Sequence, residues 1–187
     1  MQYRPFGSTG LRVSEVGFGA WAIGGGAMIG DTAIGWGEVD DAEAGATIHA
    51  ALDAGITFFD TADIYGLGHS ETLLGRHIGS RPDVVVATKV GNVAREGKFT
   101  IDYSPGHIRQ ACEGSLRRLK RGHIDYYQLH TARMEHLVNG ECLMAMRQLQ
   151  QEGKVRHWGL SLNTFAPLEE AHWMMRHGHG EGFQLVL

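Results

Sequence analysis

The chain has few of the residues that would mark it as secreted or membrane-bound. It contains two cysteines and four prolines in 187 residues, and no stretch approaches the roughly eighteen consecutive apolar residues of a membrane span. Cys112 and Cys142 lie far apart without a C-x-x-C motif, which favours a reduced intracellular protein over a disulfide framework. The opening MQYRPFGSTG lacks the apolar core of a signal peptide. We therefore expect a cytoplasmic protein.

The chain also lacks an excess of positive charge. Its formal net charge is −4, and its lysines and arginines are scattered singly, so we expect neither nucleic acid nor an anionic membrane as a partner. His177 and His179 lie in a glycine-rich loop without a partner at metal-ligand spacing, so no metal site is predicted. A small molecule is the expected partner, and the length indicates a single domain.

Glycine is abundant instead, with 27 copies, about twice its usual share of roughly 7%. One unit recurs along the chain: a short apolar run, a polar or glycine-bearing loop, an amphipathic helix and a closing glycine. The runs are short, β-branched and aromatic, as strands buried on both faces must be. They span residues 16–24, 57–63, 84–91, 124–130, 155–163 and 183–187.

Start and stop signals delimit the helices between these runs. Asp40 with Glu43 predicts a helix that ends before Gly55, and Ser104 followed by proline predicts another that ends at Gly122. Less complete start and stop signals predict three more helices. One is capped by Ser70 and ends near Gly79, one spans 137–151, and one spans 167–177.

Strands and helices that alternate in this way predict an α/β fold with a parallel sheet, either open and doubly wound or closed into a barrel. Apolar and polar residues alternate on both sides of Ser8, Thr9 and Gly10, which predicts an N-terminal β-hairpin. A complete eight-unit barrel needs about 250 residues. About six strands are found here, so the sheet is expected to be either open or an incomplete barrel.

A loose dinucleotide-binding pattern starts at Gly17, continues through Gly19 and ends at Ala22. A working fingerprint follows a strand and opens a helix. Here the glycines lie inside the apolar run, and the glycine-rich segment after them cannot be helical. We therefore interpret this match as fortuitous.

Polar residues end three consecutive predicted strands. Asp60, with Asp63 and Tyr65 just beyond it, follows the second run, Lys89 ends the third and His130 ends the fourth. Taken singly, these residues are explained as loop caps, a structural ion pair and a buried imidazole. Parallel β/α proteins place their active sites at this edge of the sheet, however. There a nearby ammonium would lower the pKa of a phenol, a carboxylate would orient that ammonium, and an imidazole would hold a carbonyl oxygen.

The order of these motifs resembles the aldo-keto reductase family. The segments are GFGAWAIGG, ALDAGITFFDTADIYGLGHSETLLGRHI, VVVATKVG, SLRRLKRGHIDYYQLH and GKVRHWGLSLN. The most specific is D-T-A-x-x-Y-G-x-G-x-S-E followed by a strand-end T-K. The resemblance covers residues 11–187. It implies a (β/α)8 TIM barrel, incomplete here, and reversible NADPH-linked reduction of aldehydes or ketones to alcohols.

The resemblance also assigns roles. The family's catalytic tetrad falls on Asp60, Tyr65, Lys89 and His130. Tyr65 would donate the proton, Lys89 and Asp60 would tune it, and His130 would orient the carbonyl of a small-molecule substrate while hydride passes from the nicotinamide.

The cofactor-binding residues implied by the family are Trp21, Asp60, Ser161, Asn163 and Gln184. Trp36 and the 24–38 loop are expected to shape the same pocket. The loops that hold the adenine end in this family follow the seventh and eighth strands. We therefore expect residues 1–187 to form an aldo-keto reductase domain that lacks the C-terminal part of the barrel.

Two other functions remain open. A β/α-barrel lyase would use Lys89 to form a Schiff base. A reductase-like fragment or subunit would bind nucleotide or a partner without turnover. The sequence does not identify the substrate, the preference between NADP and NAD, or the oligomeric state.

Overall fold

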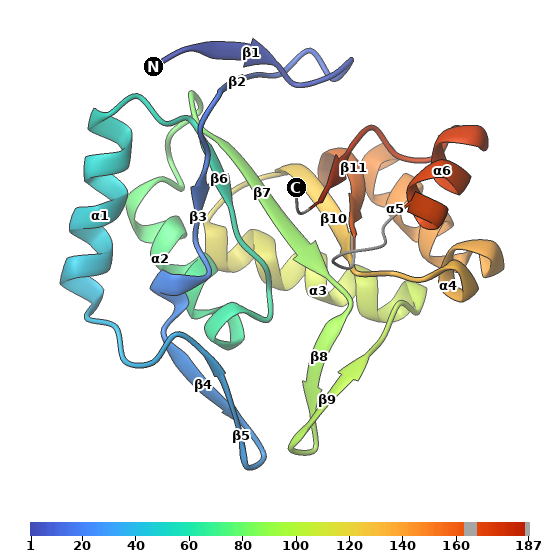
Figure 1. The fold of residues 1–187 in the computed structure, drawn as a ribbon, viewed down its shortest axis with the longest axis horizontal. Helices are drawn as coiled ribbons and strands as arrows, with labels where there is room; N and C mark the ends of the chain where they lie inside the picture. The colour runs from blue at the N-terminus through green and yellow to red at the C-terminus, as the bar shows by residue number, and fades with distance from the viewer. Residues whose placement is uncertain (163–167, 186–187) are drawn as a thin grey trace.

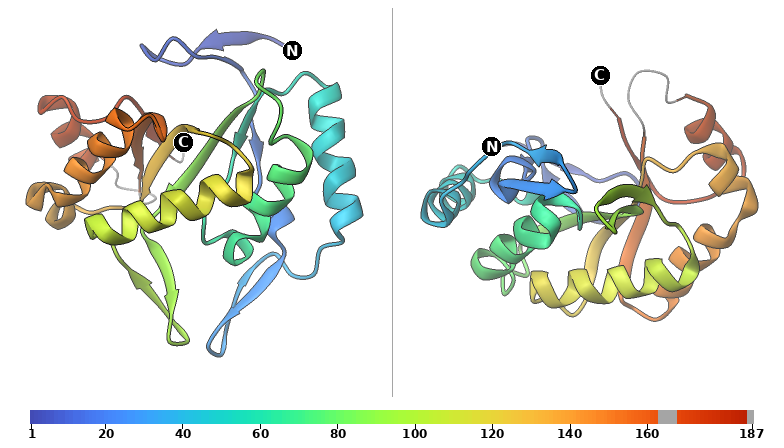
Figure 2. Two further views of the ribbon diagram at one scale, coloured as in Figure 1. Left: turned by 180° about the vertical axis from the view of Figure 1, so that it is seen from behind. Right: turned by 90° about the horizontal axis from the view of Figure 1, so that it is seen from below.

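The computed structural model describes residues 1–162 and 168–185 and contains a six-stranded, wholly parallel sheet (Figure 1). Its order is β12-β11-β10-β7-β6-β3, so each strand pairs with the strand of this sheet that precedes it in the chain. A doubly wound sheet reverses its strand order part-way. This sheet does not reverse, and it curls with helices along its outer side (Figure 2). The fold is therefore of the (β/α)8 barrel type, incomplete as predicted.

The strands lie within the predicted apolar runs, and β3 and β6 are much shorter than the runs that contain them. They are β3 (Phe18–Gly19), β6 (Phe58–Asp60), β7 (Val85–Val90), β10 (Ile124–His130), β11 (Val155–Ser161) and β12 (Phe183–Gln184). Every residue of β7 and β10 is buried, as the uninterrupted apolar pattern indicates for strands covered on both faces.

The helices are α1 (Asp41–Asp53), α2 (His69–His77), α3 (Pro105–Leu119), α4 (Met134–Asn139), α5 (Glu141–Gln151) and α6 (Leu168–Arg176). Two predicted starts are confirmed. Asp40 accepts hydrogen bonds from the backbone N–H groups of Ala42 and Glu43, at 2.8 and 3.0 Å. Ser104 accepts one from His107 at 3.3 Å, ahead of α3. These bonds satisfy donors that the first turn of a helix leaves unpaired.

Other helix predictions were wrong in detail. Ser70 does not cap α2, because its hydroxyl is buried and donates to the carbonyl oxygen of Ala20 at 2.7 Å. The helix predicted over 137–151 is two helices, divided at Gly140, whose φ is +80°. Helix α3 ends earlier than Gly122, because Lys120 takes the left-handed conformation.

Three β-hairpins extend from the two ends of the sheet. The predicted N-terminal hairpin pairs β1 (Tyr3–Pro5) with β2 (Arg12–Ser14) and lies beyond the amino ends of the strands (Figure 1). Two hairpins that were not predicted project from the opposite end. They are β4 (Gly26–Ile29) with β5 (Thr32–Gly35), and β8 (Asn92–Arg95) with β9 (Lys98–Ile101). Their tips meet at Gly30 and Gly97.

Two large apolar clusters form most of the core. One packs α1 and α2 against β6 and β7, and the other packs α3 and α5 against β10 and β11. Cys112 and Cys142 are buried and form no disulfide, and burial raises their pKa values to about 12 and about 11. Thiols in such surroundings stay protonated and unreactive.

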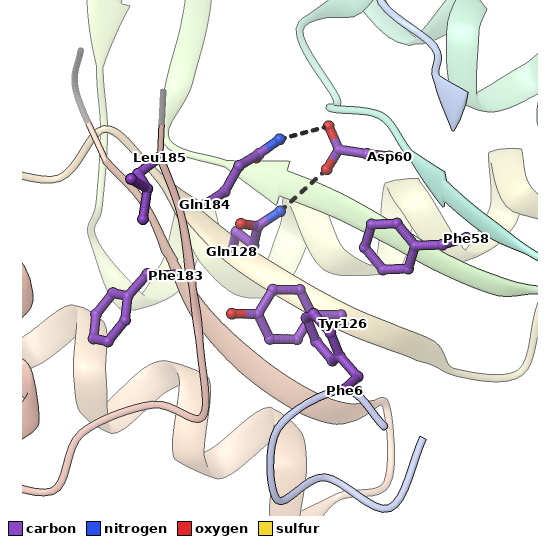
Figure 3. A pocket seen from close by; sticks show the side chains of 8 residues that line it. All are labelled: Phe6, Phe58, Asp60, Tyr126, Gln128, Phe183, Gln184 and Leu185. Atoms are coloured by element: carbon purple, nitrogen blue, oxygen red, sulfur yellow. Dashed lines mark hydrogen bonds between the residues drawn. The ribbon is translucent and has the colours of Figure 1, made fainter. Parts of the chain in front are cut away.

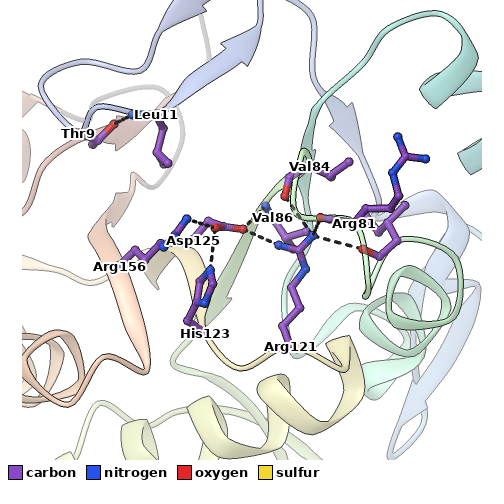
Figure 4. A network of polar contacts seen from close by, with 10 residues as sticks. Thr9, Leu11, Arg81, Val84, Val86, Arg121, His123, Asp125 and Arg156 are labelled. Carbon is purple, nitrogen blue, oxygen red and sulfur yellow. Dashed lines mark hydrogen bonds and ion pairs between the residues drawn. The ribbon is translucent and has the colours of Figure 1, made fainter.

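An ionic network joins the amino ends of the central strands (Figure 4). The buried carboxylate of Asp125 accepts from Arg121 at 2.7 Å, from the backbone N–H of Val86 at 3.0 Å and from Arg156 at 3.4 Å. Arg121 also donates to the carbonyl oxygen of Arg81 at 2.8 Å. Removal of one partner of such a buried pair typically costs about 3–5 kcal/mol, because it leaves the other charge uncompensated inside the protein. This end of the sheet is therefore structural.

Within the two described ranges, no helix combines the length and the apolar character that a membrane span requires.

Candidate functional site

The carboxyl ends of the strands bring the predicted polar residues to one rim. Asp60 is the last residue of β6, Lys89 the last but one of β7, and His130 the last of β10. Two further polar residues lie beside His130 along this rim. In the register of the sheet, His130 pairs with Ser161, and Ser161 pairs with Gln184. Partners in a parallel register point to the same face of a sheet. The side chains of His130, Ser161 and Gln184 therefore lie side by side.

Lys89 lies at the centre of the rim and is 1% exposed. Its ammonium donates to Asp60 Oδ2 at 2.6 Å, to the carbonyl oxygen of Thr61 at 2.9 Å and to Tyr65 Oη at 3.3 Å. Three acceptors match the three N–H bonds of an ammonium, which explains how this charge is tolerated inside the protein. The ion pair with Asp60 alone would be a structural feature. The third contact brings a phenol to the same cation.

Tyr65 enters the site through a tight turn. It starts a 3-10 turn in which Gly66 and Leu67 both adopt left-handed backbone conformations. Its ring stacks on Trp21 with centroids 5.8 Å apart and meets the ring of His130 edge-on at 5.9 Å. The phenol therefore has an indole on one side, an imidazole on another and an ammonium at its oxygen.

The predicted direction of the Tyr65 pKa was wrong. Burial raises the pKa of the phenol above its ordinary value of 10.0, and the Lys89 ammonium opposes this effect without reversing it. Removal of water disfavours the charged phenolate more than one nearby cation favours it. Tyr65 is consequently a protonated phenol at neutral pH, which is the form that can donate a proton.

His130 is an uncharged imidazole. Burial lowers its pKa to about 3, and the nearby Lys89 ammonium contributes in the same direction. Its Nδ1 is buried, with no hydrogen-bond partner among the described residues. A neutral imidazole in this position can donate one hydrogen bond to an acceptor next to the Tyr65 phenol.

Two glutamines hold the carboxylate of Asp60 (Figure 3). Gln128 donates to Oδ1 at 3.2 Å and Gln184 donates to Oδ2 at 3.1 Å. Gln128 is fully buried and was missed by the sequence reasoning. It precedes His130 by two positions in β10, so the two-residue period of a strand places both on the same face and could have identified it.

A pocket of about 260 Å³ opens beside Tyr65 and His130. Apolar walls come from Trp21, Ile64 and the two unpredicted hairpins, which contribute Ile34 and Phe99. The expectation that the 24–38 segment shapes this mouth is confirmed. Trp36 adds an edge-on contact with Trp21 at 5.5 Å. The segment forms a hairpin, which also shows that the glycines from Gly17 onward open no dinucleotide-binding helix.

The residues expected to hold a nicotinamide lie along the same rim where they are described. Ser161 is buried next to His130, Gln184 reaches Asp60, and Trp21 is half exposed at the mouth. Asn163 lies outside the described residues. A row of hydroxyl and amide groups beside a buried ion pair suits the carboxamide of a nicotinamide, so the described residues fit the cofactor.

Comparisons with known proteins identify the family of the chain. The family described as "Aldo/keto reductase family" matches residues 15–180. The "Aldo-keto reductase YhdN" of Bacillus subtilis (strain 168) is 36% identical over 182 residues, which cover 92% of this chain and 52% of the relative. The "L-galactose dehydrogenase" of Arabidopsis thaliana is 35% identical over 86% of this chain and 48% of the relative. The chain thus spans about half the length of the curated relatives it matches.

Two solved structures of similar proteins also match this chain over about half of their own length. The holo form of "aldo-keto reductase AKR11C1" from Bacillus halodurans superimposes with a TM-score of 0.79 at 33% identity, over 94% of this chain and 54% of that one. The "glycerol dehydrogenase AKR11B4" from Gluconobacter oxydans gives a TM-score of 0.76 at 35% identity, over 95% and 52%.

Proposed function

The chain belongs to the aldo/keto reductase family of oxidoreductases, and from this premise we propose that it reduces aldehydes or ketones to alcohols with NADPH. The observation that carries the proposal is the position of Lys89, whose ammonium contacts Asp60 and Tyr65 while His130 lies against the Tyr65 ring. The whole protein's activity is part of this proposal, because the chain covers about half of its relatives.

Tyr65 is the proposed proton donor. Its phenol is protonated at neutral pH because burial raises its pKa, and the Lys89 ammonium stabilises the negative charge that develops as the proton leaves. Asp60 accepts from the Lys89 ammonium and fixes its direction, and the two glutamines fix Asp60. His130, uncharged, donates a hydrogen bond to the substrate carbonyl oxygen and thereby orients it.

NADP, when bound, supplies the hydride. We propose that Ser161, Asn163 and Gln184 hold its nicotinamide amide, and that Trp21 and Asp60 lie against it. Of these residues, Ser161 and Gln184 occupy adjacent register positions, which supports a shared role.

The proposed substrate is a small carbonyl compound. The pocket beside Tyr65 has a volume of about 260 Å³, with apolar walls and a polar end formed by Tyr65, His130 and Asn92. This shape suits a compact molecule whose carbonyl faces the tetrad. Two of the similar proteins are named for glycerol and L-galactose, both small polyols or sugars.

A Schiff-base lyase is not favoured. An amine must be uncharged to attack a carbonyl carbon. Each N–H bond of Lys89 has an acceptor, and one of these acceptors is the carboxylate of Asp60 at 2.6 Å. This environment stabilises the charged ammonium and leaves Lys89 a weak nucleophile.

The test is to follow NADPH consumption by the purified protein with a simple aldehyde, alongside borohydride treatment in the presence of the same aldehyde. The proposal predicts aldehyde-dependent oxidation of NADPH and no covalent label on Lys89. A borohydride-trapped adduct on Lys89 would contradict it in favour of the lyase. NADPH binding without turnover would contradict it in favour of a nucleotide-binding subunit.

A further inference from the structure

A second cavity lies behind the wall of the Tyr65 pocket. Its volume is about 410 Å³, and it lies between α3, β8 and the segment that follows β6. Ile64 and Asn92 line both cavities, whereas none of the four tetrad residues lines the second one. We call it the arginine cleft, after Arg95, Arg117 and Arg118 in its lining.

The lining of the arginine cleft is positively charged in a chain whose net charge is −4. Arg118 pairs with buried Glu71 at 2.7 Å, and Arg95 pairs with Asp102 at 3.0 Å, but neither carboxylate lines the cleft. Arg117 is exposed and makes no ion pair with the described residues.

Among the described residues that line the cleft, Asp63 carries the only carboxyl group. Burial, together with the nearby Glu71 carboxylate, raises the pKa of Asp63 to about 8. At pH 7 this carboxyl group is therefore mostly protonated. It adds little negative charge, and in this form it can donate a hydrogen bond.

Arg118, which lines the cleft, is held in position by its neighbours. A Cβ atom added at Gly68 would lie 2.7 Å from its Cδ, and one added at Gly114 would lie 3.1 Å from its Nη1. The two glycines therefore make room for the guanidinium. Its Nε donates to Glu71 and its Nη2 to Ser115, while no partner for Nη1 is found within the described part of the chain.

Three buried polar atoms on lining residues also have no partner among the described residues. They are Asp63 Oδ1, Asn92 Oδ1 and His107 Nε2. Buried polar atoms are nearly always hydrogen-bonded in native proteins, so these three exceptions mark bonding positions for ordered water or for a polar group of a ligand.

We propose that the arginine cleft binds a small molecule that carries a phosphate or carboxylate group. Guanidinium groups present parallel N–H donors whose geometry matches such oxyanions. The apolar side chains of Ile64 and Leu67 would contact the remainder of the molecule. Because Ile64 and Asn92 also line the Tyr65 pocket, the ligand would lie next to the reductase site without occupying it.

The test is isothermal titration calorimetry of the 187-residue protein with inorganic phosphate, and separately with citrate, at constant ionic strength and pH 7. We expect saturable binding at a single site. Replacement of two arginines that line the cleft, Arg95→Gln together with Arg117→Gln, should weaken the affinity for the anion at least fivefold. Both side chains are exposed, so the fold should survive, which circular dichroism can verify.

Arg4→Gln with Arg176→Gln is the matched control. It removes the same charge, and Arg4 pairs with Glu15 as Arg95 pairs with Asp102. The affinity of this control should equal that of the wild type. Tighter binding of phosphate than of citrate would identify a phosphorylated ligand, and the reverse order would identify a carboxylate. The absence of saturable binding to either anion, or an equal loss of affinity in the control, would overturn the proposal whether or not the protein is a reductase.

Discussion

At the scale of single residues, the pairing of Lys89 was predicted from the sequence, whereas two properties of its surroundings were not. A lysine at the end of the buried run VVVATK had to be paired, and its contact with Asp60 at 2.6 Å confirms this. The contribution of Gln128 was missed, because the alternation of a strand gives its face but not the atom it reaches. The pKa direction of Tyr65 was wrong, because the depth of its burial depends on Trp21 and the hairpins around it.

Asp63 provides a residue-scale prediction. Its pKa is raised from 3.8 to about 8 in the folded protein, so the folded state binds a proton that the unfolded state releases between these values. This contribution to the free energy of unfolding is fully present below pH 3.8 and is lost as the pH rises to about 8. The side chain of Asp63→Asn has no proton to lose. The free energy of unfolding of this variant should therefore exceed that of the wild type by an amount that grows across this pH window to a few kcal/mol.

Urea denaturation of both proteins between pH 4 and pH 8 checks this outcome, with Asp53→Asn on the exposed face of α1 as a control for the loss of one carboxyl group. Parallel stability curves for the wild type and Asp63→Asn would refute the raised pKa.

At the scale of elements, helices with strong caps were predicted and the β4–β5 and β8–β9 hairpins were not. Asp40 and Ser104 make their capping bonds because a short polar side chain before an apolar stripe satisfies the first free N–H groups. In the 24–38 segment, glycines occupy strand positions and hide the alternation that identifies a hairpin. Gly140 divides α4 from α5 for a related reason, since its positive φ is not visible in a sequence pattern.

The contact between hairpin tips provides an element-scale prediction. Gly30 has a φ of +57°, and a side chain there would collide with the backbone of Gly97 in the other hairpin. Gly30→Ala should therefore separate β4–β5 from β8–β9. Hydrogen exchange should speed up in both hairpins, including Asn92–Ile101, where no residue is changed.

Gly10→Ala is the matched control, because Gly10 also has a positive φ but an added Cβ would contact nothing within 4 Å. It should accelerate exchange in the N-terminal hairpin alone. Unchanged exchange of β8 and β9 in Gly30→Ala would show that the tips do not support each other.

At the scale of the whole molecule, strand order decides the architecture that the sequence left open. Alternating strands and helices suit both an open sheet and a barrel. The uninterrupted neighbour order from β3 to β12 selects the barrel, because each crossover then leaves its helix on the same outer side. Three consecutive β/α units thereby carry Asp60 with Tyr65, Lys89 and His130 to a single rim. A family resemblance predicted this convergence, and the contacts around Lys89 give its physical basis.

The central claim is that the Tyr65 phenol protonates a carbonyl oxygen at this rim. Its most direct test is the single-turnover rate of aldehyde reduction at saturating NADPH in Tyr65→Phe, with Tyr127→Phe, a buried core tyrosine, as the matched control. The account predicts a rate reduced by about 10²- to 10⁴-fold in Tyr65→Phe, with NADPH affinity unchanged, and a wild-type rate in Tyr127→Phe. Tyr65→Phe turning over at the wild-type rate would contradict it.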